Sequence, residues 1–91
     1  MSKNLRWYNP SLDKHEELKD EVLDIVKDKG RIETPDILEE VKPHFKKEYE
    51  WSGQYIRNML SDIRVVLEDE DEIRTEKNPE GGEPTFVWVR K

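Results

Sequence analysis

Residues Trp51 to Leu67 read WSGQYIRNMLSDIRVVL, and this stretch decides the fold. Its aliphatic residues recur at steps of four, three and four positions: Ile56, Leu60, Ile63 and Leu67. That spacing is typical of the buried face of an amphipathic helix. We therefore predict a helix over 52–67 that packs one face on the core.

The start of this helix is also marked in the sequence. Ser52 fits the N-cap position, where its hydroxyl can accept a hydrogen bond from a backbone N–H of the first turn. Trp51 precedes the cap and Ile56 occupies the fourth helical position, a pair that predicts a hydrophobic staple. The helix should thus begin immediately after Ser52.

Opposite the apolar face lies a face of hydrogen-bonding side chains, here called the polar face: Gln54, Asn58 and Ser61. Arg57 and Arg64 flank it, and Asp62 stands near its edge. No carboxylate occupies its centre, although the chain as a whole is acidic. We interpret the segment as a recognition helix that reads a nucleic acid.

Composition limits the classes of protein open to this chain. Its 91 residues are enough for one domain with a modest core. An apolar fraction of 33% and a charged fraction of 42% also suit a disordered chain, but the regular helical spacing favours folding. The absence of cysteine excludes disulfides and Cys-based zinc sites.

No run of apolar residues approaches the length of a membrane span, and the first residues lack a signal-peptide core. We expect a soluble, intracellular protein located in the cytoplasm.

Charge is distributed unevenly along the chain, whose net charge is −6. Residues 13–28 and 32–40 each carry −4, and residues 68–72 carry −5. Between Lys42 and Arg64, five bases against three acids give +2. The total charge opposes non-specific adhesion to DNA, but its distribution leaves a positive region that includes the proposed recognition helix.

A first helix precedes this region. Its start has two candidates, namely Asn9-Pro10 as cap and first residue, or Asp13 with Glu16 as a capping box. Its apolar face comprises Leu18, Val22, Ile25 and Val26, and Gly30 should end it. Leu5, Trp7 and Tyr8 are too apolar for a solvated tail, so residues 1–11 should form an arm packed on the domain or on a partner.

A second helix should follow a brief strand at Arg31–Glu33. Thr34-Pro35 offers another cap followed by proline, and the apolar face comprises Ile37, Leu38, Val41 and Phe45. Pro43 disfavours helical geometry at the preceding residue, so this helix should end or kink there. Residues 46–50 would then connect it to the helix over 52–67.

The last part of the chain predicts a β-hairpin. Residues 73–77 alternate like a half-buried strand, and residues 85–89, TFVWV, are rich in β-forming side chains. Between them, residues 78–83 are dense in turn formers. Phe86 and Trp88 should share one face of the returning strand.

This order of elements resembles the winged helix-turn-helix family of DNA-binding domains. The resemblance is carried by residues 30–34 (GRIET), by residues 52–60 (SGQYIRNML) and by the hairpin 73–90, and it spans residues 12–91. It implies an α+β fold of three helices with a small antiparallel sheet, in which the hairpin is the wing. In this family the third helix commonly enters the major groove.

The resemblance also implies positions for DNA contact. On the third helix these are Ser52, Gln54, Tyr55, Arg57, Asn58 and Ser61, and in the wing they are Lys77 and Asn78. Lys46, Lys47 and Arg64 are further phosphate candidates because of their charge. Gln or Asn can pair bidentately with adenine and Arg with guanine; the plain alternative is that these side chains solvate an exposed helix.

Enzyme chemistry finds no support in the sequence. No nucleophile motif, phosphate-binding glycine loop or metal-ligand spacing is present, and neither His15 nor His44 belongs to a motif. A solvent-exposed or capping role suits these histidines better than metal binding. We expect no catalysis, no cofactor and no metal.

Two hypotheses follow for function. The first is sequence-specific binding of double-stranded DNA by a small transcriptional regulator, and the second is a winged-helix module that binds a protein partner. In the second, exposed aromatic residues and acidic runs would meet that partner. Since no long helix follows the hairpin, a homodimer would use the N-terminal segment or the first helix.

Overall fold

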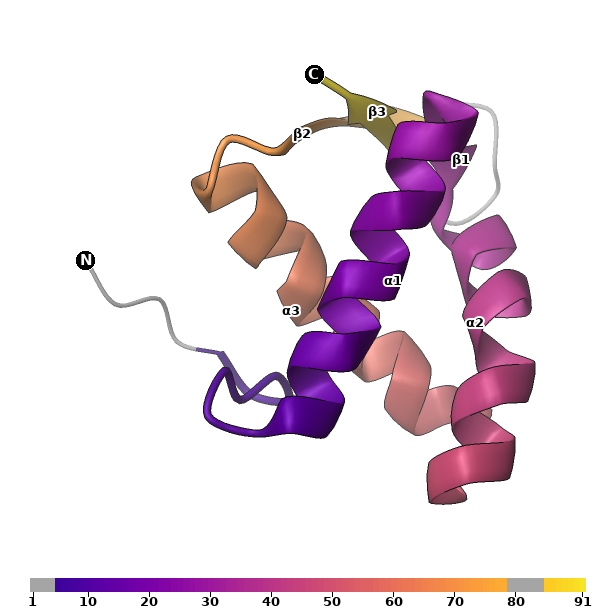
Figure 1. Ribbon diagram of the computed structural model, residues 1–91. Coiled ribbons are helices and arrows are strands. Elements are labelled where there is room, and N and C mark those ends of the chain that lie inside the picture. The colour runs from indigo at the N-terminus through magenta and orange to yellow at the C-terminus, as the bar shows by residue number, and fades with distance from the viewer. Residues whose placement is uncertain (1–4, 79–84) are drawn as a thin grey trace.

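The computed structural model describes residues 5–78 and 85–91. In this part, three helices pack together and a small sheet lies at one end of them (Figure 1). The helices are α1 (Asp13–Lys29), α2 (Thr34–Tyr49) and α3 (Gly53–Asp69). The strands are β1 (Arg31–Glu33), β2 (Ile73–Asn78) and β3 (Thr85–Arg90).

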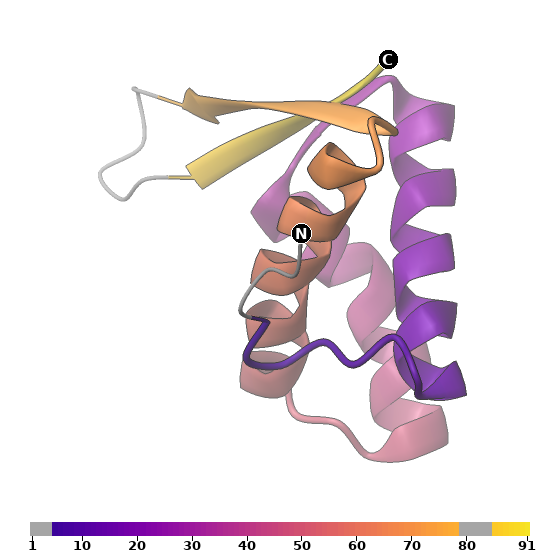
Figure 2. The ribbon, with the colours of Figure 1, turned by 90° about the vertical axis from the view of Figure 1, so that its left-hand side faces the viewer.

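The three strands form an antiparallel sheet in the order β1-β3-β2. Ile32 of β1 and Thr75 of β2 both lie opposite Trp88, so β3 is the central strand. The β2–β3 hairpin extends past the helices on one side (Figure 2). The predicted α+β class and its winged-helix-like topology are confirmed.

The core contains the apolar face predicted for α3. Ile56, Leu60, Ile63 and Leu67 are all fully buried, and Met59 joins them from the neighbouring helical position. Trp88 of β3 is also fully buried and belongs to the same cluster. Ile25 and Leu38, predicted on the apolar faces of α1 and α2, are only partly buried and pack against the edge of this cluster.

Helix α3 begins as predicted, because the Ser52 hydroxyl accepts a hydrogen bond from the backbone N–H of Tyr55 at 3.1 Å. Helix α1 also ends as predicted at Gly30, which adopts a positive φ of 77°. Of the two predicted starts of α1, Asn9-Pro10 is wrong; Asp13 is the first residue of the helix, but it does not cap it. Its N-cap residue is Leu12, without a side-chain cap, and the Asn9 side chain instead accepts a bond from the Ser11 N–H at 2.9 Å.

The sequence predicted that the second helix would end or kink at Pro43. The predicted end is wrong, since α2 continues through Pro43 to Tyr49. A proline inside a helix removes one backbone hydrogen bond. Val41 and Phe45, on either side of Pro43, are both fully buried, and this burial favours the helical path through the proline. Glu50 then ends the helix in a left-handed conformation, with a φ of 57°.

The connection between α2 and α3 is consequently only residues 50–52, and not the longer segment 46–50 that the sequence suggested. Lys46 and Lys47 lie in the last turn of α2. The two helices therefore meet in a short turn at the end of the molecule away from the sheet (Figures 1 and 2).

Thr34 does not cap α2, although the sequence suggested this role. Glu33 holds the cap position without a side-chain bond, while the Thr34 hydroxyl donates to the Phe86 carbonyl oxygen at 3.2 Å. The same hydroxyl accepts the indole N–H of Trp88 at 2.7 Å. Thr34 thus ties the start of α2 to the central strand.

Within the described residues, no helix is both long and apolar enough to cross a membrane.

Candidate nucleic-acid interface

The polar face of α3 is open to solvent. Gln54 and Ser61 are exposed and Asn58 is half-buried, while Arg57 beside them is exposed. The Gln54 side-chain amide donates to Asn58 Oδ1 at 3.0 Å, one helical turn away. An amide nitrogen has a second donor hydrogen and an amide oxygen a second lone pair, so both side chains can still pair with a base edge.

The N-terminus of α3 offers a positive end beside this face. No acidic residue lies in its first turn, and Ser52 uses only one of the free N–H groups there. Lys46 and Lys47 stand exposed just before the turn, and no ion pair engages either side chain within the described part of the chain. Such a helix end suits a phosphate group.

Two predicted contact residues have structural partners that sequence reasoning missed. The Tyr55 hydroxyl is hydrogen-bonded to His15 Nε2 at 3.2 Å, and its ring packs edge-on against Trp51. Arg64 pairs with Glu68 at 2.6 Å, and its guanidinium lies 3.8 Å from the centre of the Phe86 ring. DNA contact by Tyr55 and Arg64 stays a prediction, and each would have to leave or share these partners.

The wing residue Lys77 is exposed on β2, opposite Phe86 of β3. It borders a hollow between the sheet and the start of α2, together with Glu33 and Glu76. The Asn78 side chain and the predicted turn residues 79–83 lie outside the described residues. The carboxylates beside Lys77 weaken the positive potential that a phosphate contact there requires.

His15 is buried, contrary to the expectation of an exposed or capping histidine. It is 5% exposed and lies among the rings of Tyr8, Trp51 and Tyr55. Its Nδ1 accepts the backbone N–H of Asn9 at 2.8 Å. Burial lowers the pKa of His15 below its ordinary value. No local spacing signals this role, since Trp51 and Tyr55 come from segments far along the chain.

His44, in contrast, is exposed on α2 and pairs with Glu17 of α1 at 3.4 Å, so an exposed role is correct for this histidine. Tyr49 also donates its hydroxyl to Glu17, and this bond lowers the pKa of that carboxyl. Glu17 therefore links α1 to the last two turns of α2.

The segment before α1 lies against the edge of the polar face. Asp62 Oδ2 accepts the backbone N–H groups of Trp7 at 2.6 Å and Tyr8 at 3.0 Å. Tyr8 is buried, and its hydroxyl donates to Glu16 of α1. Burial, and then the bond to Glu16, raise the pKa of the Tyr8 phenol. The division into residues 1–11 and 12–91 stays a prediction.

Comparisons with protein-family models, with curated proteins and with solved structures find no match. The fold itself therefore defines the class, a protein of winged-helix-like topology. In the described ranges 5–78 and 85–91, no group of three or more His, Cys, Asp or Glu residues is arranged to hold a metal ion.

Proposed function

We propose that this protein binds double-stranded DNA in a sequence-specific manner, as a small transcriptional regulator, with the polar face of α3 in the major groove. One observation carries the proposal. In a chain of net charge −6, an exposed helix face presents Gln54, Asn58 and Ser61 beside Arg57, with no carboxylate among them. Amide and guanidinium groups are the side chains best suited to base edges in that groove.

The surroundings of this face support the same function. The free N–H groups at the start of α3 can bind a backbone phosphate, and the exposed Lys46 and Lys47 lie in the last turn of α2, with the acids Glu48 and Glu50 in the same segment. Acidic residues 69–72 lie at the opposite end of α3, where Lys19 and Lys27 of α1 pair with Glu70 and Glu72. Charge therefore favours DNA approach along the first turns of α3.

The net charge also sets the kind of binding to expect. With few phosphate contacts available, non-specific affinity should be poor and specific binding should depend on a small number of base contacts. Affinity should still weaken as salt rises, because each phosphate contact releases counterions.

The test begins with selection of preferred sites from random duplex DNA at low salt. Titrations of the preferred and a scrambled duplex at several salt concentrations then compare Asn58→Ala with Lys47→Ala. Loss of Asn58 should cost about 1–3 kcal/mol on the preferred site and relax its choice of base. Loss of Lys47 should weaken both duplexes alike and reduce the salt slope by about one.

Lys29→Ala is the matched control, because Lys29 is an exposed lysine in the last turn of α1. It changes the net charge as Lys47→Ala does, but at the other end of the molecule. If Lys47→Ala and Lys29→Ala changed DNA affinity equally, the effect would come from net charge and not from a phosphate contact of Lys47. If Asn58→Ala left affinity and base preference unchanged, the polar face would not be the surface that contacts the bases.

A second candidate function, binding of a protein partner, has an observation of its own. Trp7 is 44% exposed and Leu12 47% exposed, and both border a hollow that Leu5 and Pro10 also line. Exposed apolar groups around a hollow are typical of protein-binding surfaces. Failure to select any duplex sequence at low salt would favour this function over DNA binding.

A further inference from the structure

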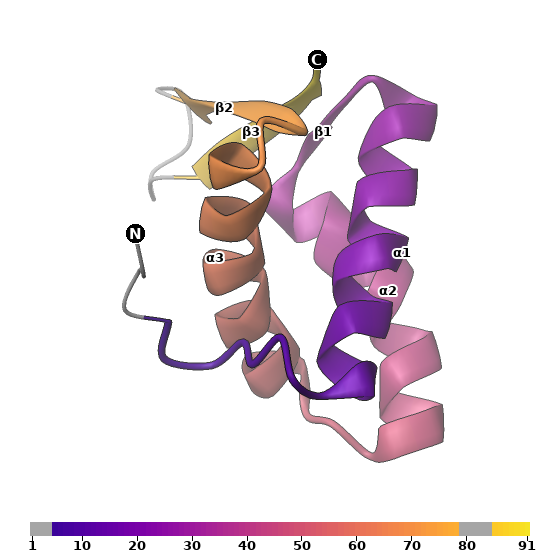
Figure 3. The ribbon, with the colours of Figure 1, turned by 60° about the vertical axis from the view of Figure 1, so that its left-hand side comes forward.

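Within the predicted N-terminal arm, residues 1–11, the segment Leu5–Tyr8 lies across α3 near the α2–α3 turn. From here on, the arm means Leu5–Tyr8. Figures 2 and 3 show it passing in front of the lower turns of α3. Its two hydrogen bonds to Asp62 join backbone N–H groups to a carboxylate that follows Asn58 by one helical turn. The arm is therefore fixed at the edge of the polar face.

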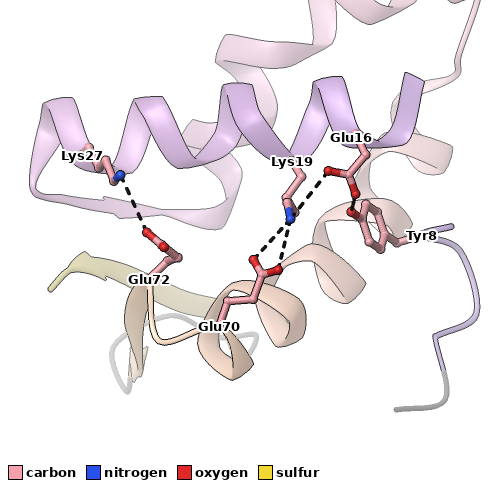
Figure 4. Close-up of polar contacts among 6 residues, drawn as sticks. All are labelled: Tyr8, Glu16, Lys19, Lys27, Glu70 and Glu72. Atoms are coloured by element: carbon pink, nitrogen blue, oxygen red, sulfur yellow. Dashed lines mark hydrogen bonds and ion pairs between the residues drawn. The ribbon is translucent and has the colours of Figure 1, made fainter. Parts of the chain in front are cut away.

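One further hydrogen bond holds the arm at its other side, and neighbouring contacts support it. The Tyr8 hydroxyl donates to Glu16, and Lys19 lies between Glu16 at 3.7 Å and Glu70 at 3.2 Å (Figure 4). The next residue of the chain, Asn9, gives its N–H to the buried His15. The backbone at Trp7 and Tyr8 is thus held between α1 and α3, and this fixes where the preceding residue leaves the domain.

Asp62 is an acidic side chain at the edge of the polar face, and it accepts two N–H groups of the arm. A carboxylate that accepts two N–H groups is partly offset by their dipoles. Asp62 is half-buried under the arm, so its charge opposes an approaching phosphate less than an exposed carboxylate does. Its role is to hold the arm.

The arm also brings a positive charge to this edge. Leu5–Tyr8 contains one base, Arg6, and no acid, in a chain of net charge −6. Arg6 is exposed, and it forms no hydrogen bond or ion pair with the described residues. It directly precedes Trp7, whose N–H is bound to α3, so its backbone cannot lie more than about one residue length from that contact.

The width of the groove decides which part of DNA Arg6 can reach. A helix with its side chains is about 10–12 Å across, and the major groove of B-DNA is about 12 Å wide. With the polar face against the bases, groups at the edge of that face stand at the rim of the groove. The rim consists of phosphates, which a guanidinium binds well.

We propose that the arm is a second DNA-binding element, in which Arg6 binds a backbone phosphate at the rim of the groove occupied by α3. Asp62 is a positioning residue that holds the arm for this contact. The role of the arm rests on the proposed function of α3, and it extends the interface beyond the helix and the wing.

Two substitutions at Asp62 test this assignment by the sign of their effects. Asp62→Asn and Asp62→Ala remove the same negative charge from the DNA-facing side, so charge alone predicts tighter binding for both. Asn keeps an oxygen that can accept the N–H groups of Trp7 and Tyr8, and Ala does not. We expect Asp62→Asn to bind the preferred duplex at least as tightly as the wild type, and Asp62→Ala to bind it more weakly.

Arg6→Ala should weaken binding about eightfold at about 0.1 M salt and lower the salt slope by about 0.9, the values for one lost phosphate contact. Arg31→Ala is the matched control. Arg31 is an exposed arginine of β1, the edge strand on the other side of β3 from β2; its guanidinium pairs with Glu76 of β2 at 3.2 Å, and its loss changes the net charge equally. Adding Asp62→Ala to Arg6→Ala should cause little further loss, because both act through the same contact.

NMR spectra of the free variants report the arm without DNA. The Trp7 and Tyr8 amide signals should stay protected from hydrogen exchange in Asp62→Asn and lose protection in Asp62→Ala. Equal tightening by both Asp62 variants, or equal effects of Arg6→Ala and Arg31→Ala, would overturn the role of the arm while α3 kept its function. If the wild type selects no duplex at all, DNA binding by α3 is refuted, and the proposed role of the arm is refuted with it.

Discussion

Replacing Thr34 by Val should destabilise the fold through the hydrogen bonds between α2 and β3. The Thr34 hydroxyl accepts the Trp88 indole N–H at 2.7 Å and donates to the Phe86 carbonyl at 3.2 Å. Trp88 is fully buried, so its N–H has no access to water once the hydroxyl is gone. Valine keeps the shape of the side chain but can accept no hydrogen bond.

The expected loss follows from the group left unpaired. A buried donor without a partner costs about 1–3 kcal/mol. For a domain of this size each kcal/mol lowers the midpoint of thermal unfolding by about 4–8 °C. Thr34→Ser is the matched control, because it keeps the hydroxyl and loses only a methyl group, which is worth about 0.8 kcal/mol when buried.

The measurement is urea and thermal unfolding followed by circular dichroism, in the wild-type and in the Trp88→Phe background. Without the indole N–H, Thr34→Val should cost less, and the difference between backgrounds should be about 0.5–3 kcal/mol. The reasoning is refuted if Thr34→Val is no more harmful than Thr34→Ser, or if the cost is the same in both backgrounds.

Three further predictions concern the core, the cap and the buried histidine. Leu60→Ala should lower the free energy of unfolding by about 2–5 kcal/mol through lost burial and a residual cavity, and a near-neutral value would place Leu60 outside the core. Ser52→Ala should cost about 1 kcal/mol and Ser52→Gly only a few tenths, while equal costs would mean that Ser52 acts through some contact other than the cap. Burial lowers the pKa of His15 in the folded state, so the unfolded chain binds more protons below the ordinary value of 6.5. Stability should therefore fall as pH drops below that value. Between pH 8 and pH 5, the free energy of unfolding measured in urea should fall less for a non-titrating His15→Asn variant than for the wild type.

Several elements could be predicted because their signals are local. The spacing of Ile56, Leu60 and Ile63 determines the buried face of α3, and Ser52 determines where the helix begins. Gly30 likewise ends α1, because it adopts a positive φ that most other residues disfavour. Each signal acts within about one helical turn, so the linear sequence contains it in full.

Other elements depended on packing. Pro43 is a local signal against a helix, yet the burial of Val41 and Phe45 favours continuation of α2 through it. Thr34 and Pro35 resemble a cap followed by the first helical residue, but the Thr34 hydroxyl bonds to a strand about 50 positions later. In both cases a contact between distant segments outweighs the local preference.

The candidate interface likewise contains features that local sequence determines and features that tertiary contacts determine. The sequence by itself determined the polar face of α3, because helical periodicity alone brings Gln54, Asn58 and Ser61 together. Only the tertiary structure decided that Asp62 holds the arm, with partners 54 and 55 positions away. His15 is buried among rings from three segments for the same reason. Hydrogen bonds and ring contacts at such separations follow from the path of the folded chain, and no repeating pattern along the sequence encodes them.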